Sequence, residues 1–273
     1  PPAGERQFDF RDADFSRVRR MIYAHAGIAL GEHKREMVYS RLARRLRAQG
    51  RQEFAAYLDE LERDSASPEW EHFINALTTN LTAFFREAHH FPILAEFARQ
   101  RPGPVSVWCC AASTGEEPYS IAMTLAETRA GSSRVFATDI DTQCLQRART
   151  GVYAWERIAK MEPERLRRFF LRGKGSNEGH VKVRPELAQM VDFATLNLLG
   201  PVREQFDAIF CRNVMIYFDK PTQARILRRF VPLLKPGGLL FAGHSENFTY
   251  ISQDFQLLGQ TVYQCAARAG VPA

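Results

Sequence analysis

The apolar positions divide the chain into two regions with different periodicity. From Phe8 to about Thr82, apolar residues recur at three- and four-residue spacings, as at Leu42 and Leu46, which is the pattern of amphipathic helices. Four chain breakers cut this region into about four short helices: Gly27, Gly31, Gly50 and Pro68. This first region therefore predicts a small all-α domain, which we place at residues 1–85.

Beyond a Pro- and Gly-rich breaker at 101–104, short apolar segments alternate with helical ones. Fully apolar strands between helices are typical of a largely parallel sheet that is covered on both faces. The expected strands lie at 105–110, 135–139, 191–194, 206–210 and 239–242. Residues 86–273 therefore predict a doubly wound α/β domain.

An insert interrupts this α/β pattern. About fifty residues separate the second and third expected strands, which is more than one crossover helix needs. A turn-rich stretch at 172–179 precedes alternating residues at 180–184, the pattern of a small antiparallel hairpin. We place this β-subdomain at about 160–190, within the stretch between Gly151 and Met190.

Composition excludes several classes of protein. The chain has 273 residues, 45% of them hydrophobic, no run of eighteen apolar residues and a polar start at 1–11, so we expect a cytoplasmic protein. Five cysteines, with Cys109 and Cys110 adjacent in a strand, do not suggest a disulfide framework. No H-E-x-x-H motif is present, and His89 and His90 cannot share one helix face, so we predict no metal.

The net charge of +6 and the pI near 9.2 favour an acidic partner. Nucleic acid, an anionic membrane and an acidic protein surface all remain open on charge alone. A basic helix at about 34–47 contains Arg41, Arg44 and Arg45, which would ordinarily form a solvated face. Beside a catalytic domain, the same helix is suited to dock an acidic helix.

A candidate cofactor site follows the first two strands of the α/β region. In open α/β sheets, ligands bind beyond the carboxyl ends of the strands. The turn at 111–118 has one glycine, Gly115, so it matches the phosphate-binding G-x-G-x-x-G poorly, and no P-loop is present. Asp139 ends the second strand, twenty-four residues after Gly115, where an acidic side chain accepts ribose hydroxyls. The pattern therefore predicts an adenosine ligand without a phosphate cradle.

Four segments resemble the signatures of the CheR family of chemotaxis receptor methyltransferases. They are NLTAFFRE at 80–87, AASTGEEPYS at 111–120, CRNVMIYF at 211–218 and GHSENF at 243–248. The similarity spans essentially the whole chain, to GQTVY at 259–263. It implies a Rossmann-like S-adenosylmethionine-dependent methyltransferase domain behind the all-α domain. It also implies methyl transfer to glutamate carboxylates of chemotaxis receptors, with S-adenosylhomocysteine as the product.

The resemblance also implies which residues bind the cofactor. These are Asn80, Thr82, Arg86, Gly115, Glu117, Asp139, Asn197, Leu198 and Asn213. Asn80, Thr82 and Arg86 are expected at the methionine end or in the catalytic pocket, with Asn197, Leu198 and Asn213 bordering the adenine. Without the resemblance, capping and turn roles are the ordinary interpretation of Asn80, Thr82 and Asn197.

Arg86 and Tyr217 are the expected catalytic residues. Methyl transfer from a sulfonium is an in-line displacement, so positioning is the main task. A glutamate side chain, with a pKa of about 4.3, is already ionised at neutral pH, and no general base is needed. Arg86 orients the carboxylate by a two-pronged contact, and Tyr217 donates to the same oxygens or to the cofactor. A helical turn beginning at Asn213 would place Asn213 and Tyr217 on one face.

The resemblance assigns the partners as well. It implies that the all-α domain contacts the methylation helices of chemotaxis receptors. For the β insert two interpretations stay open, binding of a C-terminal receptor pentapeptide and a structural hairpin with solvated charges. The candidate residues that would bind the carboxylates of that tail are Arg172, Lys182 and Arg184. At position 182 the best-matching relatives commonly have an arginine, and a lysine cannot make the same two-pronged contact. We expect a monomer that is recruited to receptor clusters at the inner face of the membrane, without inserting into it.

Two other functions remain alternatives. A nucleic-acid methyltransferase would share the fold and the basic charge, but residues 213–216 lack an Asn-Pro-Pro-Tyr-like motif and no base-stacking module is recognisable. We therefore expect no nucleic acid partner. A non-catalytic receptor-binding adaptor is the second alternative, and retention of Arg86, Glu117, Asp139 and Tyr217 disfavours it. The sequence does not identify the receptor or the glutamates.

Overall fold

The computed structural model describes residues 7–128 and 132–266, and the chain forms two compact units. Unit 1 contains the residues through Thr79 together with Tyr217–Asp219. Unit 2 contains Asn80–Ile216 and the chain from Lys220 onward. Among the described residues, no helix combines the length and the apolar character that a membrane span requires.

Unit 1 consists of four helices, as the sequence predicts. They are α1 (Asp12–Ala26), α2 (Arg35–Ala48), α3 (Phe54–Arg63) and α4 (Glu69–Leu77), and a 3₁₀ turn, η1 (Glu32–Lys34), precedes α2. Their apolar stripes meet in a core in which Val18, Leu42 and Leu58 are fully buried. Tyr217 and Asp219 add to this unit, because the Tyr217 carbonyl accepts from Ala29 N at 2.8 Å and Tyr23 donates to Asp219 at 2.8 Å.

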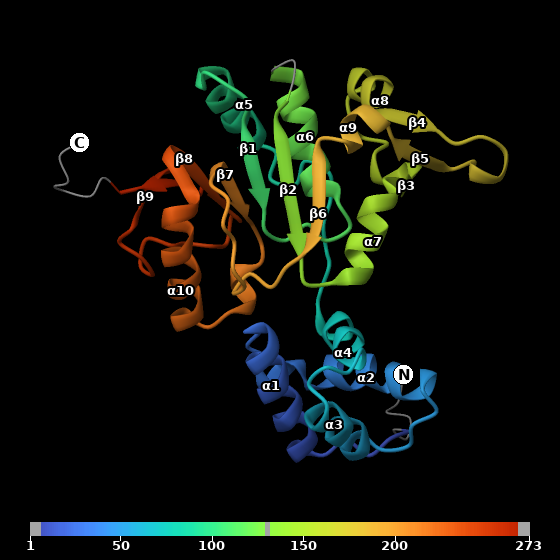
Figure 1. Cartoon of the computed structure of the whole chain (residues 1–273). Helices are drawn as coiled ribbons and strands as arrows, with labels where there is room; N and C mark the ends of the chain where they lie inside the picture. Colours follow the sequence, from blue (N-terminus) through green and yellow to red (C-terminus); the bar gives the residue numbers. More distant parts are fainter. Residues whose placement is uncertain (1–6, 129–131, 267–273) are drawn as a thin grey trace. The chain divides into compact units, whose positions relative to one another are not determined.

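Unit 2 is built on a seven-stranded sheet of order β6-β2-β1-β7-β8-β10-β9 (Figure 1). The parallel strands are β1 (Ser106–Cys109), β2 (Arg134–Asp139), β6 (Val191–Thr195), β7 (Phe206–Cys211) and β8 (Leu234–Ala242). All five were predicted from their apolar runs. An antiparallel hairpin, β9 (Phe255–Gly259) and β10 (Val262–Cys265), extends the sheet and was not predicted. Strand order reverses between β1 and β7, which creates the usual ligand-binding edge of such sheets.

Helices cover both faces of this sheet. They are α5 (His90–Gln100), α6 (Glu116–Thr128), α7 (Thr142–Thr150) and α10 (Lys220–Phe230). Side chains alternate across a strand, so Val107 and Cys109 of β1 join the core under α5 and α6. Trp108 points to the other face and packs edge-on against Phe230 of α10, with ring centres 5.5 Å apart.

Three thiols lie at the site end of the central strands. Cys109 ends β1, Cys110 follows it and Cys211 ends β7, and all three are buried. Burial raises the pKa of each thiol.

The insert forms a separate three-stranded antiparallel sheet of order β3-β5-β4. Its strands are β3 (Val152–Ala154), β4 (Phe170–Arg172) and β5 (His180–Val183), and Figure 1 shows them beyond the β6 edge of the main sheet, near α7. The predicted hairpin is the β4–β5 pair, whereas β3 was not predicted. The remaining elements are the 3₁₀ turns η2 (Trp155–Arg157), η3 (Gly175–Asn177), η4 (Met215–Tyr217) and η5 (Val231–Leu233), and the helices α8 (Pro163–Phe169) and α9 (Pro185–Ala188).

Candidate active site

The loop after β1 is tightly held against the end of β2. Ser113 N donates to Asp139 Oδ2 at 2.7 Å, and Ser113 has a positive φ of 48°. Gly115 has a φ of +98°, and a Cβ there would lie 2.6 Å from the Tyr153 hydroxyl oxygen and 2.9 Å from Ala148 Cβ. Glycine is therefore required at 115 by both conformation and space.

Asp139 lies at the carboxyl end of β2 and is nearly buried. Its second oxygen accepts from Asp141 N at 2.9 Å. Burial raises the pKa of Asp139 to about 6, although the backbone donors act in the opposite direction. Asp141 in turn accepts from Asn80 Nδ2 at 2.7 Å. The structure thus brings two predicted cofactor residues, Asn80 and Asp139, to the same loop.

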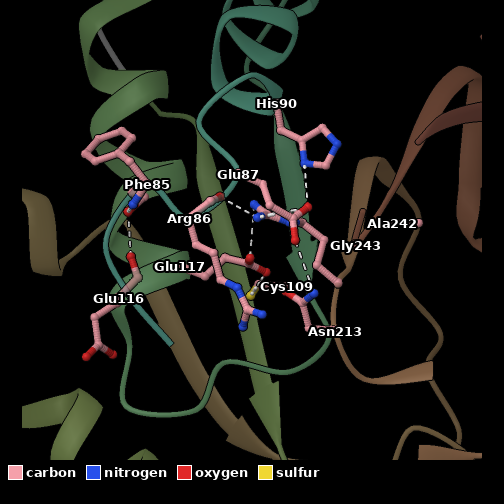
Figure 2. Close-up of polar contacts among 12 residues, drawn as sticks. Phe85, Arg86, Glu87, His90, Cys109, Glu116, Glu117, Asn213, Ala242 and Gly243 are labelled. Carbon is pink, nitrogen blue, oxygen red and sulfur yellow. Dashed lines mark hydrogen bonds and ion pairs between the residues drawn. The ribbon is translucent and has the colours of Figure 1, made fainter. Parts of the chain in front are cut away.

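A buried arginine, Arg212, links two acidic residues of the site. Arg212, which follows β7, has a fully buried side chain. Its Nη1 lies 3.2 Å from Glu117 Oε2, and its Nη2 lies 3.6 Å from Glu87 Oε2. Figure 2 shows these two glutamates, Glu87 and Glu117, beside Arg86 and Asn213. Nη2 also donates to the Arg86 carbonyl oxygen. One side chain therefore joins the start of α6 to the segment that carries Arg86.

The two carboxyl groups respond differently to this environment. Burial raises the pKa of Glu117, and the Arg212 charge opposes that rise. Burial also acts to raise the pKa of Glu87, but donation by His244 and Asn213, together with Arg212, lowers it to about 2. Glu87 is therefore ionised at neutral pH, and Arg212 favours the ionised form of Glu117 against the effect of burial.

Glu246 holds the backbone of two loops near this cluster. Its carboxylate accepts from the backbone N–H groups of Asn213 and Met215, each at 2.9 Å, and of Gly243 at 2.7 Å. Asn213 consequently has a φ of +56°, and the 3₁₀ turn η4 begins only at Met215. The helical turn from Asn213 that would place Asn213 and Tyr217 on one face therefore does not form, because left-handed backbone at that residue cannot begin one.

Arg86 lies in unit 2 with a half-buried side chain, and its Nη1 donates to Leu81 O at 3.0 Å. The flanking residues Phe85 and Glu87 both have positive φ, of 51° and 52°. Phe85 N donates to Ser120 Oγ of α6 at 2.9 Å. Tyr217 belongs to unit 1, where its hydroxyl donates to Thr79 O at 3.4 Å.

Asn197 and Leu198 follow β6. The Asn197 side-chain oxygen accepts from Leu199 N at 2.9 Å, which is the turn role that the residue type ordinarily has. Leu198 is buried. Their contact with adenine stays a prediction.

Glu87, His89 and His90 place ligand atoms within 4.8 Å of one another. His90 is fully buried, its Nε2 lies 2.9 Å from Gln260 O, and burial lowers its pKa to about 4. The Arg212 guanidinium beside Glu87 repels a second cation, and Glu87 already accepts from Asn213 and His244. We therefore interpret Glu87, His89 and His90 as part of the ion-pair and hydrogen-bond cluster around Arg212 and not as a metal site.

The α2 arginines differ in their surroundings. Arg45 forms a two-pronged ion pair with Glu69, with Nε 2.6 Å from Oε1. Arg41 donates to Thr78 O at 2.6 Å. Arg44 is exposed. Two of the three predicted receptor contacts are thus engaged within unit 1.

The candidate residues for binding the receptor tail lie on or beside the small sheet. Lys182 of β5 is exposed and is in register with Val152 of β3 and Leu171 of β4, which are 44% and 40% exposed. Arg172 lies over the Trp155 ring at 5.3 Å. Arg184, after β5, donates to Arg167 O at 3.3 Å. An exposed apolar row with a central cation therefore crosses the sheet.

A doubly wound sheet with a small-residue loop after β1 and an acidic residue ending β2 defines a Rossmann-like domain of the class that binds nucleoside cofactors. Comparison with protein families refines this class. The family described as "CheR methyltransferase, SAM binding domain" matches residues 80–264, and "CheR methyltransferase, all-alpha domain" matches residues 13–78. The chain belongs to the CheR methyltransferase family, and it is an S-adenosylmethionine-dependent methyltransferase.

Similar proteins carry the name chemotaxis protein methyltransferase. That of Klebsiella aerogenes is 65% identical over 258 residues, covering 92% of this chain and 89% of the relative. That of Escherichia coli K12 is 61% identical over 258 residues, covering 92% and 90%. Chemotaxis protein methyltransferase 2 of Pseudomonas aeruginosa is 52% identical over 275 residues, covering 97% and 98%.

Glu87, Arg212 and Glu246 were not assigned a role from the sequence. All three lie inside the quoted motifs, in FFRE, CRN and GHSEN, so their motif membership was a usable signal. A charged residue directly after a buried strand, as at Arg212, was another.

Proposed function

We propose that this chain transfers the methyl group of S-adenosylmethionine to glutamate side chains of chemotaxis receptors. The observation that carries the proposal is the 52–65% identity, over more than nine-tenths of the chain, to proteins named chemotaxis methyltransferases. Both the all-α region and the cofactor-binding region match the family. The enzyme would act in the cytoplasm, as a monomer, at receptor clusters.

The charge of the site supports binding of a cationic cofactor by its predicted residues. Glu87 and Glu117 flank the Arg212 guanidinium, and burial raises the pKa of Glu117 and of the nearby Glu246. A further cation would favour the ionised form of both carboxyl groups, and the sulfonium and ammonium groups of the cofactor would be such cations. Glu117 would face the methionine end, and Asp139 would accept ribose hydroxyls. Asn80, Thr82 and Arg86 would line the methyl donor.

The remaining cofactor contacts stay as the resemblance implies them, with Gly115 allowing close approach of the loop and Asn197, Leu198 and Asn213 at the adenine. The cofactor supplies a methyl group bonded to a sulfonium sulfur. This chain's residues orient the acceptor and exclude water. Arg86 would hold the acceptor carboxylate by two N–H donors. Tyr217 would donate its hydroxyl to the acceptor or to the cofactor.

Unit 1 would dock on the receptor's acidic methylation helices. Because Arg41 and Arg45 contact Thr78 and Glu69, Arg44 is the best supported of the three candidate contacts. Long-range attraction between the basic chain and an acidic helix would raise the association rate at low salt.

The small sheet would bind the receptor's C-terminal pentapeptide. Two observations support this: β3 and β4 are edges of the sheet, and the row of Val152, Lys182 and Leu171 is exposed. A peptide strand added at an edge gains main-chain hydrogen bonds, and Arg172, Lys182 and Arg184 are the candidate partners of its carboxylates. Tethering would raise the local enzyme concentration without changing the catalytic centre.

The decisive experiment incubates candidate receptors with the enzyme and cofactor carrying an isotope-labelled methyl group, followed by peptide mass spectrometry. We expect label on glutamates, released as methanol by mild base because carboxyl methyl esters hydrolyse. Arg86→Ala and Tyr217→Phe should lower turnover far more than cofactor affinity. Label that is stable to base, or found on other residues, would contradict the proposed reaction.

The tether has a separate test. Calorimetric titration with the C-terminal pentapeptides of the host's receptors should show binding that Lys182→Met weakens and Lys174→Met, an exposed lysine in the same insert, does not. Tail-truncated receptor should be methylated more slowly. If no peptide binds and truncation leaves the rate unchanged, the enzyme works without a tail tether.

A further inference from the structure

The insert contacts both segments that carry the candidate site. Arg157, in the turn η2 after β3, donates from Nη2 to Thr82 O at 3.1 Å and pairs with the Glu116 carboxylate. Thr82 lies in the segment that leads to Arg86, and Glu116 begins α6 beside Glu117. One cation of the insert therefore joins the catalytic segment to the cofactor loop.

Glu116 depends on this contact. Its side chain is 1% exposed, whereas the Arg157 side chain is 44% exposed, so the arginine reaches inward to a buried carboxylate. The other Glu116 oxygen accepts from Thr114 Oγ1 at 2.6 Å, directly before Gly115. A buried carboxylate that loses its cation is strongly destabilised, so Arg157 stabilises the conformation in which α6 begins.

A second residue of the insert, Tyr153, contacts the same two segments, the cofactor loop and the catalytic segment. Tyr153 of β3 is buried and donates its hydroxyl to Thr114 O at 2.8 Å. Its ring packs edge-on against Phe84, with centres 4.9 Å apart and an interplanar angle of 80°. Phe84 lies between Thr82 and Arg86, so Tyr153 also joins the catalytic segment to the cofactor loop.

We propose that Arg157, supported by Tyr153, is a positioning residue for methyl transfer, which fixes the catalytic segment against the cofactor loop from the insert. The inference rests on the proposed function and deepens it, because the insert then has a role in the chemistry that is separate from any receptor tail. Arg157 acts through Thr82 and Glu116 and needs no contact with cofactor or acceptor.

The test compares Arg157→Met with a matched variant, Arg168→Met. Arg168 also joins the insert to α6, because its Nη2 donates to Ala126 O at 2.9 Å, but at the end of the helix away from the cofactor loop. We expect Arg157→Met to weaken cofactor binding roughly tenfold and to lower kcat on tail-truncated receptor by a similar factor. Arg168→Met should leave both values within twofold of wild type, whatever it does to stability.

Arg157→Lys adds a rescue arm and a variant that keeps the charge if Arg157→Met does not fold. A lysine restores the charge next to Glu116, but its compact ammonium lacks the planar guanidinium, so affinity and kcat should fall between those of wild type and Arg157→Met. Calorimetry and circular dichroism well below the unfolding temperature separate this effect from loss of fold.

Unchanged cofactor affinity and kcat in Arg157→Met, or in Arg157→Lys if only that variant folds, would overturn the inference. Equal losses in Arg168→Met would also overturn it, because the insert would then act only as general support. If wild type binds cofactor but methylates no receptor, the proposed substrate fails, and cofactor affinity alone still decides the role of Arg157.

Discussion

Replacing Arg212 with methionine removes a buried cation from between two carboxylates. The side chain is fully buried, and Glu117 and Glu87 are 11% and 10% exposed. At 3.2 Å and an effective dielectric constant of about 20, the Arg212–Glu117 attraction is about 5 kcal/mol. Part of it offsets the cost of burying the charges. We therefore expect the variant to lose about 3–5 kcal/mol of unfolding free energy, as when one partner of a buried pair is removed.

The loss should depend on pH in a definite direction. Burial already raises the pKa of Glu117, and removing Arg212 raises it further. The folded variant then takes up a proton more readily than the unfolded chain, so ionising Glu117 destabilises it. This penalty is complete above the folded pKa and absent below the unfolded one. The difference between wild type and variant should therefore be largest at high pH and shrink as the pH falls toward 4.5, the ordinary pKa of the glutamate side chain.

Urea unfolding followed by tryptophan fluorescence measures this loss. A Trp70→Phe background leaves Trp108 and Trp155, which both lie in unit 2 with Arg212. Arg99→Met serves as control, because its ion pair with Glu96 is more than half exposed and should contribute less than about 1 kcal/mol. A loss below about 1.5 kcal/mol that does not change with pH would refute the role assigned to this pair.

Three further outcomes follow from the site. Wild-type cofactor affinity should fall as the pH drops below about 6, because Asp139 takes up a proton and can no longer accept both ribose hydroxyls, whereas Asp139→Asn should bind weakly at every pH. Calorimetric titration across this pH range measures the affinity, and a wild-type affinity that does not change with pH would contradict the assignment. Gly115→Ala should cost about 1–3 kcal/mol in denaturant unfolding and weaken cofactor binding, because its Cβ would overlap Tyr153. Arg44→Glu should slow methylation of intact receptor at low salt and leave cofactor affinity unchanged, whereas Arg45→Glu should also destabilise unit 1 in thermal unfolding, because it breaks the ion pair with Glu69. If Arg44→Glu methylates the receptor as fast as wild type, Arg44 is not part of the docking surface.

The sequence was informative where a pattern is local. Strand β7 is buried along its whole length, and β1, β2 and β8 are buried over most of their residues, so each contains a run of apolar residues. The helices of unit 1 have clear apolar stripes. Strand β9 carries no such signal, because Leu257 and Leu258 are both substantially exposed and alternation is lost. Strand β3 has only three residues, too few to give a period.

The features that could not be predicted depend on contacts between residues that are far apart in the sequence. Glu246 sets the backbone at Asn213 from 33 residues away, so the expected helical turn had no local contradiction. The charges of α2 are visible in the sequence, but the carbonyls and Glu69 that engage Arg41 and Arg45 are not. Arg212 meets Glu87 and Glu117 only through the order of the strands.

The buried thiols at the ends of β1 and β7 have a consequence for how the enzyme tolerates oxidants. Oxidation and alkylation proceed through the thiolate, and burial raises the pKa of Cys109, Cys110 and Cys211. The same effect raises the pKa of Cys144 to about 12. Cys265 of β10, which is only partly buried, is therefore the position at which a maleimide dye should attach, giving a fluorescent enzyme whose cofactor loop is chemically untouched.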